Sequence, residues 1–303
     1  MSKITTTHDK FVRAILADKS VAADYFKTYL PDYVSDKLDF SSLRQLSDTY
    51  LSKQLQKTIS DIVYSCEKTS GDDIRICLLI EHKSHPDKFT PVQIGGYIIS
   101  GLQKQIENKE KLSVIIPILF YHGKEKWKYQ TLVSLFKNLD PEWKKFIPDF
   151  DYIYNNLGEI SDKSVERINN KFLVASLLAL KHSFQANWLE KNALKILVLT
   201  EEASENLQES FVVYLFSNSK LEEHKIIELL EPLPSHLKTK IMSTLDVFVK
   251  KGRLEGRREG AEETQMKIIS NLIKTSVMSD SQIASAADVS IDFVKKIRAD
   301  LRQ

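Results

Sequence analysis

Two apolar stretches, Ile59–Ser65 (ISDIVYS) and Ile74–Glu81 (IRICLLIE), decide how the first half of this 303-residue chain folds. Both are rich in β-branched and aliphatic residues, which favour strands. The residues between them include Ser70-Gly71-Asp72-Asp73, a sequence typical of a turn. The pattern predicts a β-hairpin.

Charged residues lie at one end of this hairpin. Asp61 begins one strand, and Glu81-His82-Lys83 ends the other. Because successive side chains of a strand point to opposite faces, Glu81 and Lys83 share a face, with Cα atoms about 6.6 Å apart. Mg²⁺ takes one or two carboxylates together with waters and phosphate oxygens, and a lysine stabilises developing negative charge. We therefore predict phosphodiester hydrolysis, with Asp61 and Glu81 as metal ligands and Lys83 as a catalytic cation, although surface ion pairs at a strand end would give the same pattern.

The neighbouring segments predict a mixed α/β core. Apolar spacing favours a helix over Asp9–Leu30, in which Phe11 should be buried. A second helix should run from Thr90 to about Asn108, with Thr90 as N-cap, Pro91 in the first turn and Gln93 closing a capping box. Ser113–Tyr121 (SVIIPILFY) predicts a buried strand, in which Pro117 favours an edge position or a bulge.

The rest of the chain predicts helices. We divide the chain into a core over 1–150, a helical extension over 151–250 and a C-terminal module over 251–303. Gly252, Gly256 and Gly260 recur every four residues and indicate either close helix–helix approach in a homodimer or a hinge. Ser279–Ala286 and Ser290–Leu301 predict two short helices of helix-turn-helix type, after an apolar stripe.

Composition limits the function classes. The 43 basic and 41 acidic residues nearly cancel, so a nucleic-acid contact must come from local basic patches. Such a patch follows the last core strand, where lysines between Lys124 and Lys145 alternate with Trp127, Tyr129 and Trp143. There is no Gly-rich phosphate loop, no signal peptide at MSKITTTHDKFVRAIL and no run of about 20 apolar residues. With only two cysteines, a cytoplasmic protein without a membrane span is expected.

Five segments carry a closer resemblance: HDKFVRAIL (8–16), YLPDYV (29–34), SDIVYS (60–65), LLIEHKSHPD (78–87) and VIIPILFYHG (114–123). They resemble the Rpn/YhgA-like recombination-promoting nucleases, also called putative transposases, within the PD-(D/E)xK nuclease superfamily. The likeness covers about the first 150 residues. It implies a restriction-endonuclease-like αβββαβ core, although one of the three early strands is not separately visible.

The resemblance also implies an activity. It implies Mg²⁺-dependent (or Mn²⁺-dependent) cleavage of double-stranded DNA with low sequence specificity, and a link to recombination, mobile DNA or phage defence. Asp61 and Glu81 match the metal-binding acids, and Lys83 matches the ExK lysine, where many relatives carry glutamine. Gln93 falls where related nucleases place a polar residue beside the site. A catalytically inactive DNA-binding or transposase-associated assembly protein is the alternative.

Overall fold

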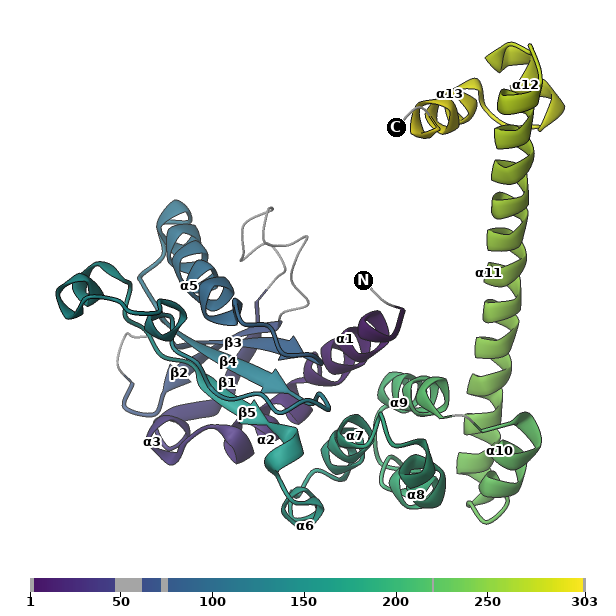
Figure 1. Ribbon diagram of the computed structural model, residues 1–303. Coiled ribbons are helices and arrows are strands. Elements are labelled where there is room, and N and C mark those ends of the chain that lie inside the picture. Colours follow the sequence, from purple (N-terminus) through teal and green to yellow (C-terminus); the bar gives the residue numbers. More distant parts are fainter. Residues whose placement is uncertain (1–2, 47–61, 72–75, 220, 302–303) are drawn as a thin grey trace. The chain divides into compact units, whose positions relative to one another are not determined.

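The computed structural model describes residues 3–46, 62–71, 76–219 and 221–301 (Figure 1). The chain divides into two compact units, Met1–Ile241 and Met242–Gln303. Within these described ranges, no helix combines the length and apolar character needed to cross a membrane. The predicted three-part division at residues 150 and 250 stays a prediction.

The first unit contains a five-stranded sheet. Its strands are β1 (Leu38–Gln45), β2 (Ile62–Lys68), β3 (Ile76–Lys83), β4 (Val114–Tyr121) and β5 (Ile153–Asn156), and they lie side by side in chain order. β1, β2 and β3 are antiparallel, whereas β3, β4 and β5 run parallel. The predicted hairpin is confirmed as β2–β3, in which Ile62 pairs with Ile80. β1 is the early strand that the sequence did not reveal, because its LDFSSLRQ run lacks a clean apolar alternation.

Pro117 lies in a strand that is flanked on both sides for only half its length. β4 pairs with β3 from Val114 to Tyr121, but with β5 only from Ile118 onward. Pro117 therefore has a strand partner on one side only, which agrees with the predicted edge position. Since proline has no N–H to donate, its position before the β5 pairing begins agrees with its chemistry.

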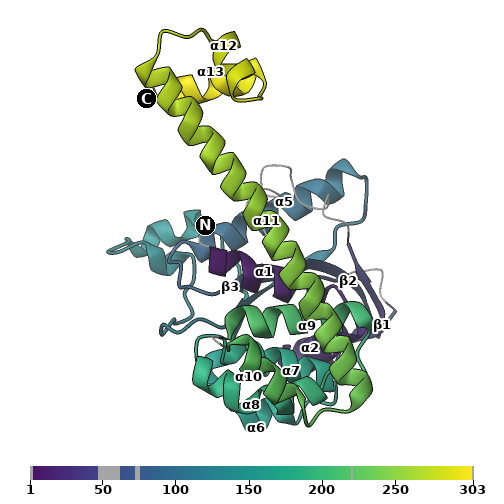
Figure 2. The same ribbon diagram turned by 90° about the vertical axis from the view of Figure 1, so that its right-hand side faces the viewer.

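Helices cover both faces of the sheet (Figures 1 and 2). One face packs against α5 (Thr90–Glu107), whose Tyr97 clusters with Val63 and Cys77. The other face packs against α1 (Lys3–Leu16) and α2 (Lys19–Tyr29), as the hydrogen bond from the Tyr64 hydroxyl to the Leu16 carbonyl illustrates.

The single first helix predicted over Asp9–Leu30 is two helices. Asp18 has an extended backbone, and its carboxylate accepts hydrogen bonds from the amides of Ser20 and Val21. This N-cap starts α2, and the short α3 (Asp32–Ser35) follows. The helical spacing of apolar residues continues from α1 into α2, and therefore the spacing did not indicate a break between them. Phe11 is buried as predicted, with 3% of its surface exposed.

The capping box predicted for α5 is also wrong. Phe89 is the residue before the helix, and no side chain caps this end, although Pro91 does lie in the first turn. The helix ends at Glu107 with Asn108 as C-cap, as expected. Gln93 is thus left available for other partners.

The helical extension predicted over 151–250 begins later than expected, because β5 lies within that range, but beyond β5 the first unit is helical. It contains α6 (Asp162–Glu166), α7 (Lys171–Lys181), α8 (Ala186–Val198), α9 (Glu205–Asn218) and α10 (Glu223–Leu230). These helices pack on the α1 side of the sheet (Figure 2). The Phe11 and Tyr214 rings, for example, stack with centroids 3.9 Å apart.

The second unit has a small core of its own. Its elements are the continuation of the 41-residue α11 (Ser235–Thr275), then α12 (Asp280–Ala286) and α13 (Ile291–Asp300). Their buried residues are Ile269, Ile283, Ala284, Val294 and Ile297. Both short helices are where the sequence predicted them. Val277, which the sequence predicted as the last residue of the apolar stripe before them, is instead fully exposed.

Candidate active site

Glu81 and Lys83 lie together at the carboxyl end of β3. Both side chains point to the α5 face of the sheet, because residues 81 and 83 are two apart on the strand. Lys83 Nζ is 3.0 Å from Glu81 Oε1. Glu81 is only 6% exposed, so a charged carboxylate here needs partners, and Lys83 is one of them.

Gln93 reaches the same group from the first turns of α5. Lys83 Nζ donates to Gln93 Oε1 at 2.8 Å, and Gln93 Nε2 donates to Asp87 Oδ2 at 3.0 Å. The amide thus accepts from the ammonium and donates to a carboxylate. This geometry fixes which end of the amide carries oxygen, and it also holds Lys83 between two acidic residues.

Two further members of this group were missed by sequence reasoning. Asp87 lies 3.7 Å from Lys83 Nζ, and the Tyr97 hydroxyl donates to Glu81 Oε2 at a long 3.4 Å. A signal for Tyr97 was present, since Gln93 and Tyr97 are four apart and share one face of a helix. Asp87 follows His85-Pro86 in a loop, where no periodicity places a side chain.

Asp61, the other predicted metal ligand, lies outside the described residues. Across the ranges that are described, no three His, Cys, Asp or Glu side chains are arranged to hold a metal ion. Of the two predicted metal ligands only Glu81 is described, and its carboxylate fits the chemistry of Mg²⁺, which binds through one or two carboxylates and keeps several waters. A cation at Glu81 would compete with the ammonium of Lys83 for the same carboxylate.

His82 points to the opposite face of β3, toward α1. His82 Nδ1 and Asp9 Oδ1 are 2.8 Å apart, so Asp9, which lies within α1, contacts His82 on this face. His82 also stacks on His122, with ring centroids 4.9 Å apart. These contacts of His82 hold the backbone between Glu81 and Lys83 in place from the opposite face of the sheet.

His8 and His122 complete this buried histidine cluster (His8, His82 and His122). His8 Nδ1 is 2.8 Å from the Tyr214 hydroxyl, while neither ring nitrogen of His122 has a side-chain hydrogen-bond partner among the residues described. Burial, then the neighbouring His82, lowers the pKa of His8 to about 4, against an opposing effect of Asp9. Burial likewise holds the pKa of His122 well below its usual value, with His82 and His8 adding to the effect. Both rings are neutral at pH 7, which fits a structural role.

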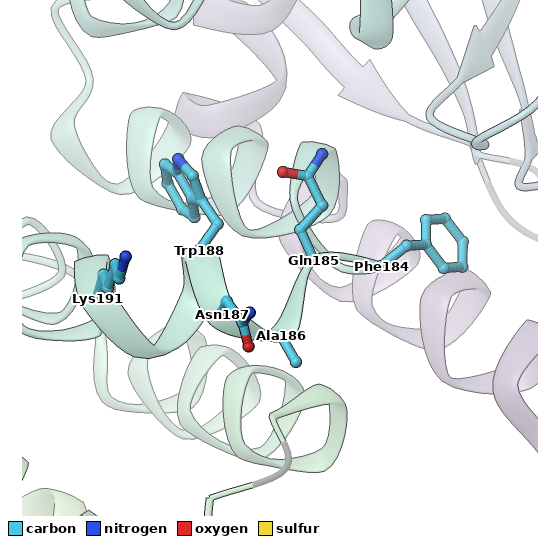
Figure 3. Close-up of a pocket in the computed structure, with 6 residues that line it drawn as sticks. All are labelled: Phe184, Gln185, Ala186, Asn187, Trp188 and Lys191. Atoms are coloured by element: carbon cyan, nitrogen blue, oxygen red, sulfur yellow. The ribbon is translucent and has the colours of Figure 1, made fainter.

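A pocket lies at the turn between α7 and α8, and Phe184 of its lining stacks on His122 (Figure 3). Its lining is Phe184, Gln185, Ala186, Asn187, Trp188 and Lys191. Trp188 stacks on His182 with centroids 3.6 Å apart. No carboxylate lines this pocket, and therefore it offers none of the ligands that the predicted chemistry needs.

Comparison with known proteins agrees with the resemblance. Residues 6–210 match the family model described as "Putative transposase, YhgA-like". Recombination-promoting nuclease RpnD of Escherichia coli O157:H7 is 25% identical over 77% of this chain and 90% of its own length. RpnC of Escherichia coli K12 is 29% identical over 39% of this chain and 40% of its own.

Other relatives carry different names. A protein of Escherichia coli K12 named inactive recombination-promoting nuclease-like protein RpnE is 27% identical over 41% of this chain and 42% of its own. No solved structure gives a significant match. Since the family model covers more than half of the residues, this chain belongs to the YhgA-like putative transposase family.

Proposed function

We propose that the protein is a metal-dependent DNA endonuclease with a PD-(D/E)xK core. The observation that supports this most directly is the contact between Glu81, Lys83 and Gln93 at the end of β3. The names of the relatives support a nuclease role. We further propose Mg²⁺ or Mn²⁺ as cofactor, low sequence specificity and double-stranded DNA as substrate.

Each residue has a distinct role in this proposal. Glu81, with Asp61, would hold the cation, which when bound supplies Lewis-acid polarisation of the phosphodiester and a more acidic water. Lys83 is a compact cation that stabilises negative charge developing on the phosphate oxygens. Gln93 orients the Lys83 ammonium, and Tyr97 fixes one oxygen of Glu81.

Cleavage of supercoiled plasmid tests the proposal. With Mg²⁺ the wild type should nick the plasmid, and EDTA should prevent it. Asp61→Ala, Glu81→Gln and Lys83→Ala should each lower the rate about 100-fold or more, because each removes charge stabilisation in the transition state. Glu166→Gln and Lys195→Ala break an exposed ion pair of similar geometry and serve as matched controls. Equal nicking by wild type and the three site variants would reject the assignment.

A catalytically inactive DNA-binding or transposase-associated assembly protein is the second candidate. It is favoured by the relatives whose names include the word inactive. Binding of plasmid in a gel shift, without cleavage under any divalent cation, would support it. Dimerisation through the glycine repeat, a helix-turn-helix role for α12–α13 and a cytoplasmic location are further proposals.

A further inference from the structure

The connection between β4 and β5 leaves the sheet on the α5 side, the side of Glu81 and Lys83. Both ends of the connection are held there, because Trp127 near its start and Tyr152 at its end are buried in one cluster with Leu119, Tyr121 and Ile94 of α5. Figure 1 shows this connection beside α5. Trp127, counted in the sequence among the possible DNA-contacting aromatics, is therefore a core residue with 8% of its surface exposed.

Farther along the connection, large aromatic side chains are exposed. Trp143 is 61% exposed and Phe146 is 75% exposed, and both lie on the 3₁₀ helix η3 (Pro141–Phe146). A 3₁₀ helix has three residues per turn and rises about 2 Å per residue, so side chains three apart lie on the same side, roughly 6 Å apart along the axis. Two large aromatic rings therefore lie side by side and exposed to solvent. A single exposed apolar side chain is ordinary, whereas a contiguous exposed apolar patch indicates a binding surface.

The chain segment that carries these rings is basic, although Lys124 at its start lies over the Phe184 ring near the α7–α8 turn. From Lys124 to Ile147 the chain has six lysines (124, 126, 128, 137, 144 and 145) and three acidic residues (125, 140 and 142), a net charge of 6 − 3 = +3. None of the six lysines forms an ion pair with another described residue. Lys144 and Lys145 lie between the two rings in sequence, and Lys145 Nζ is 5.3 Å from the centre of the Phe146 ring.

We propose that Trp143 and Phe146 form a base-stacking surface for single-stranded DNA, with the adjacent lysines contacting its phosphates. Unpaired bases expose flat π-faces that stack on aromatic side chains, whereas the faces of paired bases are covered by their neighbours in the duplex. A second copy of the chain is a poorer occupant, because two patches of the same positive charge repel each other. The proposal rests on the nuclease function for its choice of DNA, and it adds that the protein binds unpaired bases in addition to the duplex.

Oligonucleotide binding by the full-length protein in EDTA tests this surface without any cleavage. The probes are labelled oligothymidylate and an abasic oligonucleotide of the same length, which carries the same phosphates but no bases. The wild type should bind oligothymidylate more tightly. Trp143→Ala/Phe146→Ala should weaken oligothymidylate binding about tenfold or more and leave abasic binding unchanged.

The controls separate stacking from charge. Lys144→Gln/Lys145→Gln should weaken the binding of both probes and reduce its salt dependence. Trp143→Phe should retain binding, because a ring remains, and Ile227→Ala removes an apolar side chain of α10 that is exposed elsewhere. Equal affinity of the wild type for the two probes would overturn the proposal, as would an unchanged affinity of the alanine double variant or a change only in its oligomeric state.

The nuclease proposal can fail independently. Lys83→Ala should abolish plasmid cleavage and keep its preference for oligothymidylate over the abasic probe. If the wild type cleaves nothing but shows that preference, the stacking surface stands and the nuclease proposal falls. If it cleaves plasmid but shows no preference, the reverse holds.

Discussion

At the scale of single residues, Gln93 shows how one side chain can fit two local patterns. Its place in the first turn of α5 suits a capping box, yet it bonds to Lys83 and Asp87 instead. Both interpretations need a polar residue at this position. If Gln93 caps the helix, thermal stability depends on its amide. If Gln93 orients Lys83, the cleavage rate depends on it.

Substitution of Gln93 by leucine separates these two interpretations. Loss of the hydrogen bond to the Lys83 ammonium should lower the cleavage rate roughly tenfold or more, because bonds to charged groups contribute about 1.5–3 kcal/mol. The melting temperature should change little, since no helix cap is lost. Gln103→Leu, at an exposed position of the same helix, is the matched control. A large drop in melting temperature with an unchanged cleavage rate would favour the capping role.

At the scale of elements, α11 shows whether the glycine repeat interrupts the helix. The helix is continuous from Ser235 to Thr275, so the repeat does not end it. A Cβ atom at Gly252, Gly256 or Gly260 would meet nothing within 4 Å in the single chain. Neither packing within the chain nor a positive φ therefore requires glycine here, and contact with a second copy remains the proposed reason.

A Gly256→Ala variant tests that reason. In a monomer, alanine should stabilise the helix by about 0.4–1 kcal/mol, because it lowers the conformational entropy of the unfolded chain. In a dimer packed at the glycines, it should weaken association while helix content is kept. Sedimentation equilibrium and thermal unfolding measure the two effects. A monomeric wild type, or a variant dimer as tight as the wild-type dimer, would exclude close packing at this repeat.

At the scale of the whole molecule, the buried histidine cluster joins parts of the first unit that are far apart in sequence. His8 belongs to α1, His82 to β3, and His122 follows β4, while Tyr214 of α9 bonds to His8 across 206 residues. The family match over 6–210 lies entirely within this unit. The core and its helical extension therefore share one buried polar contact.

This cluster predicts acid sensitivity. The pKa of His8 is about 4 in the folded protein, below its ordinary value of 6.5. Folding therefore keeps the ring neutral, so the associated stability is complete above pH 6.5 and is lost as pH falls from 6.5 toward 4. Each such histidine contributes a slope of up to about 1.4 kcal/mol per pH unit in that window.

Chemical unfolding of wild type and His122→Phe between pH 7.5 and pH 4.5 measures this slope. His122 has no side-chain hydrogen-bond partner among the described residues, and its ring stacks on Phe184, so phenylalanine should fit the site. The variant should lose less stability than the wild type as pH falls. His224→Phe, at an exposed histidine of α10, is the control and should retain the full wild-type slope. Equal slopes for His122→Phe and wild type would contradict the prediction.

The sequence by itself determined the elements whose signals are local. The β2–β3 hairpin, the shared face of Glu81 and Lys83 and the extent of α5 all follow from alternation, turn residues and apolar spacing within a few residues. The helices of the predicted extension beyond β5 follow in the same way. Resemblance to known nucleases then supplied the chemistry proposed for Asp61, Glu81 and Lys83.

Only the tertiary structure decided which side chains meet. It placed Gln93 on Lys83 rather than at a helix cap, brought Asp87 and Tyr97 beside them and put Asp9 behind β3 with His82. These contacts join residues from different elements, up to 73 positions apart. Periodicity describes the faces of a single element, and the pairing of those faces depends on how the whole chain packs.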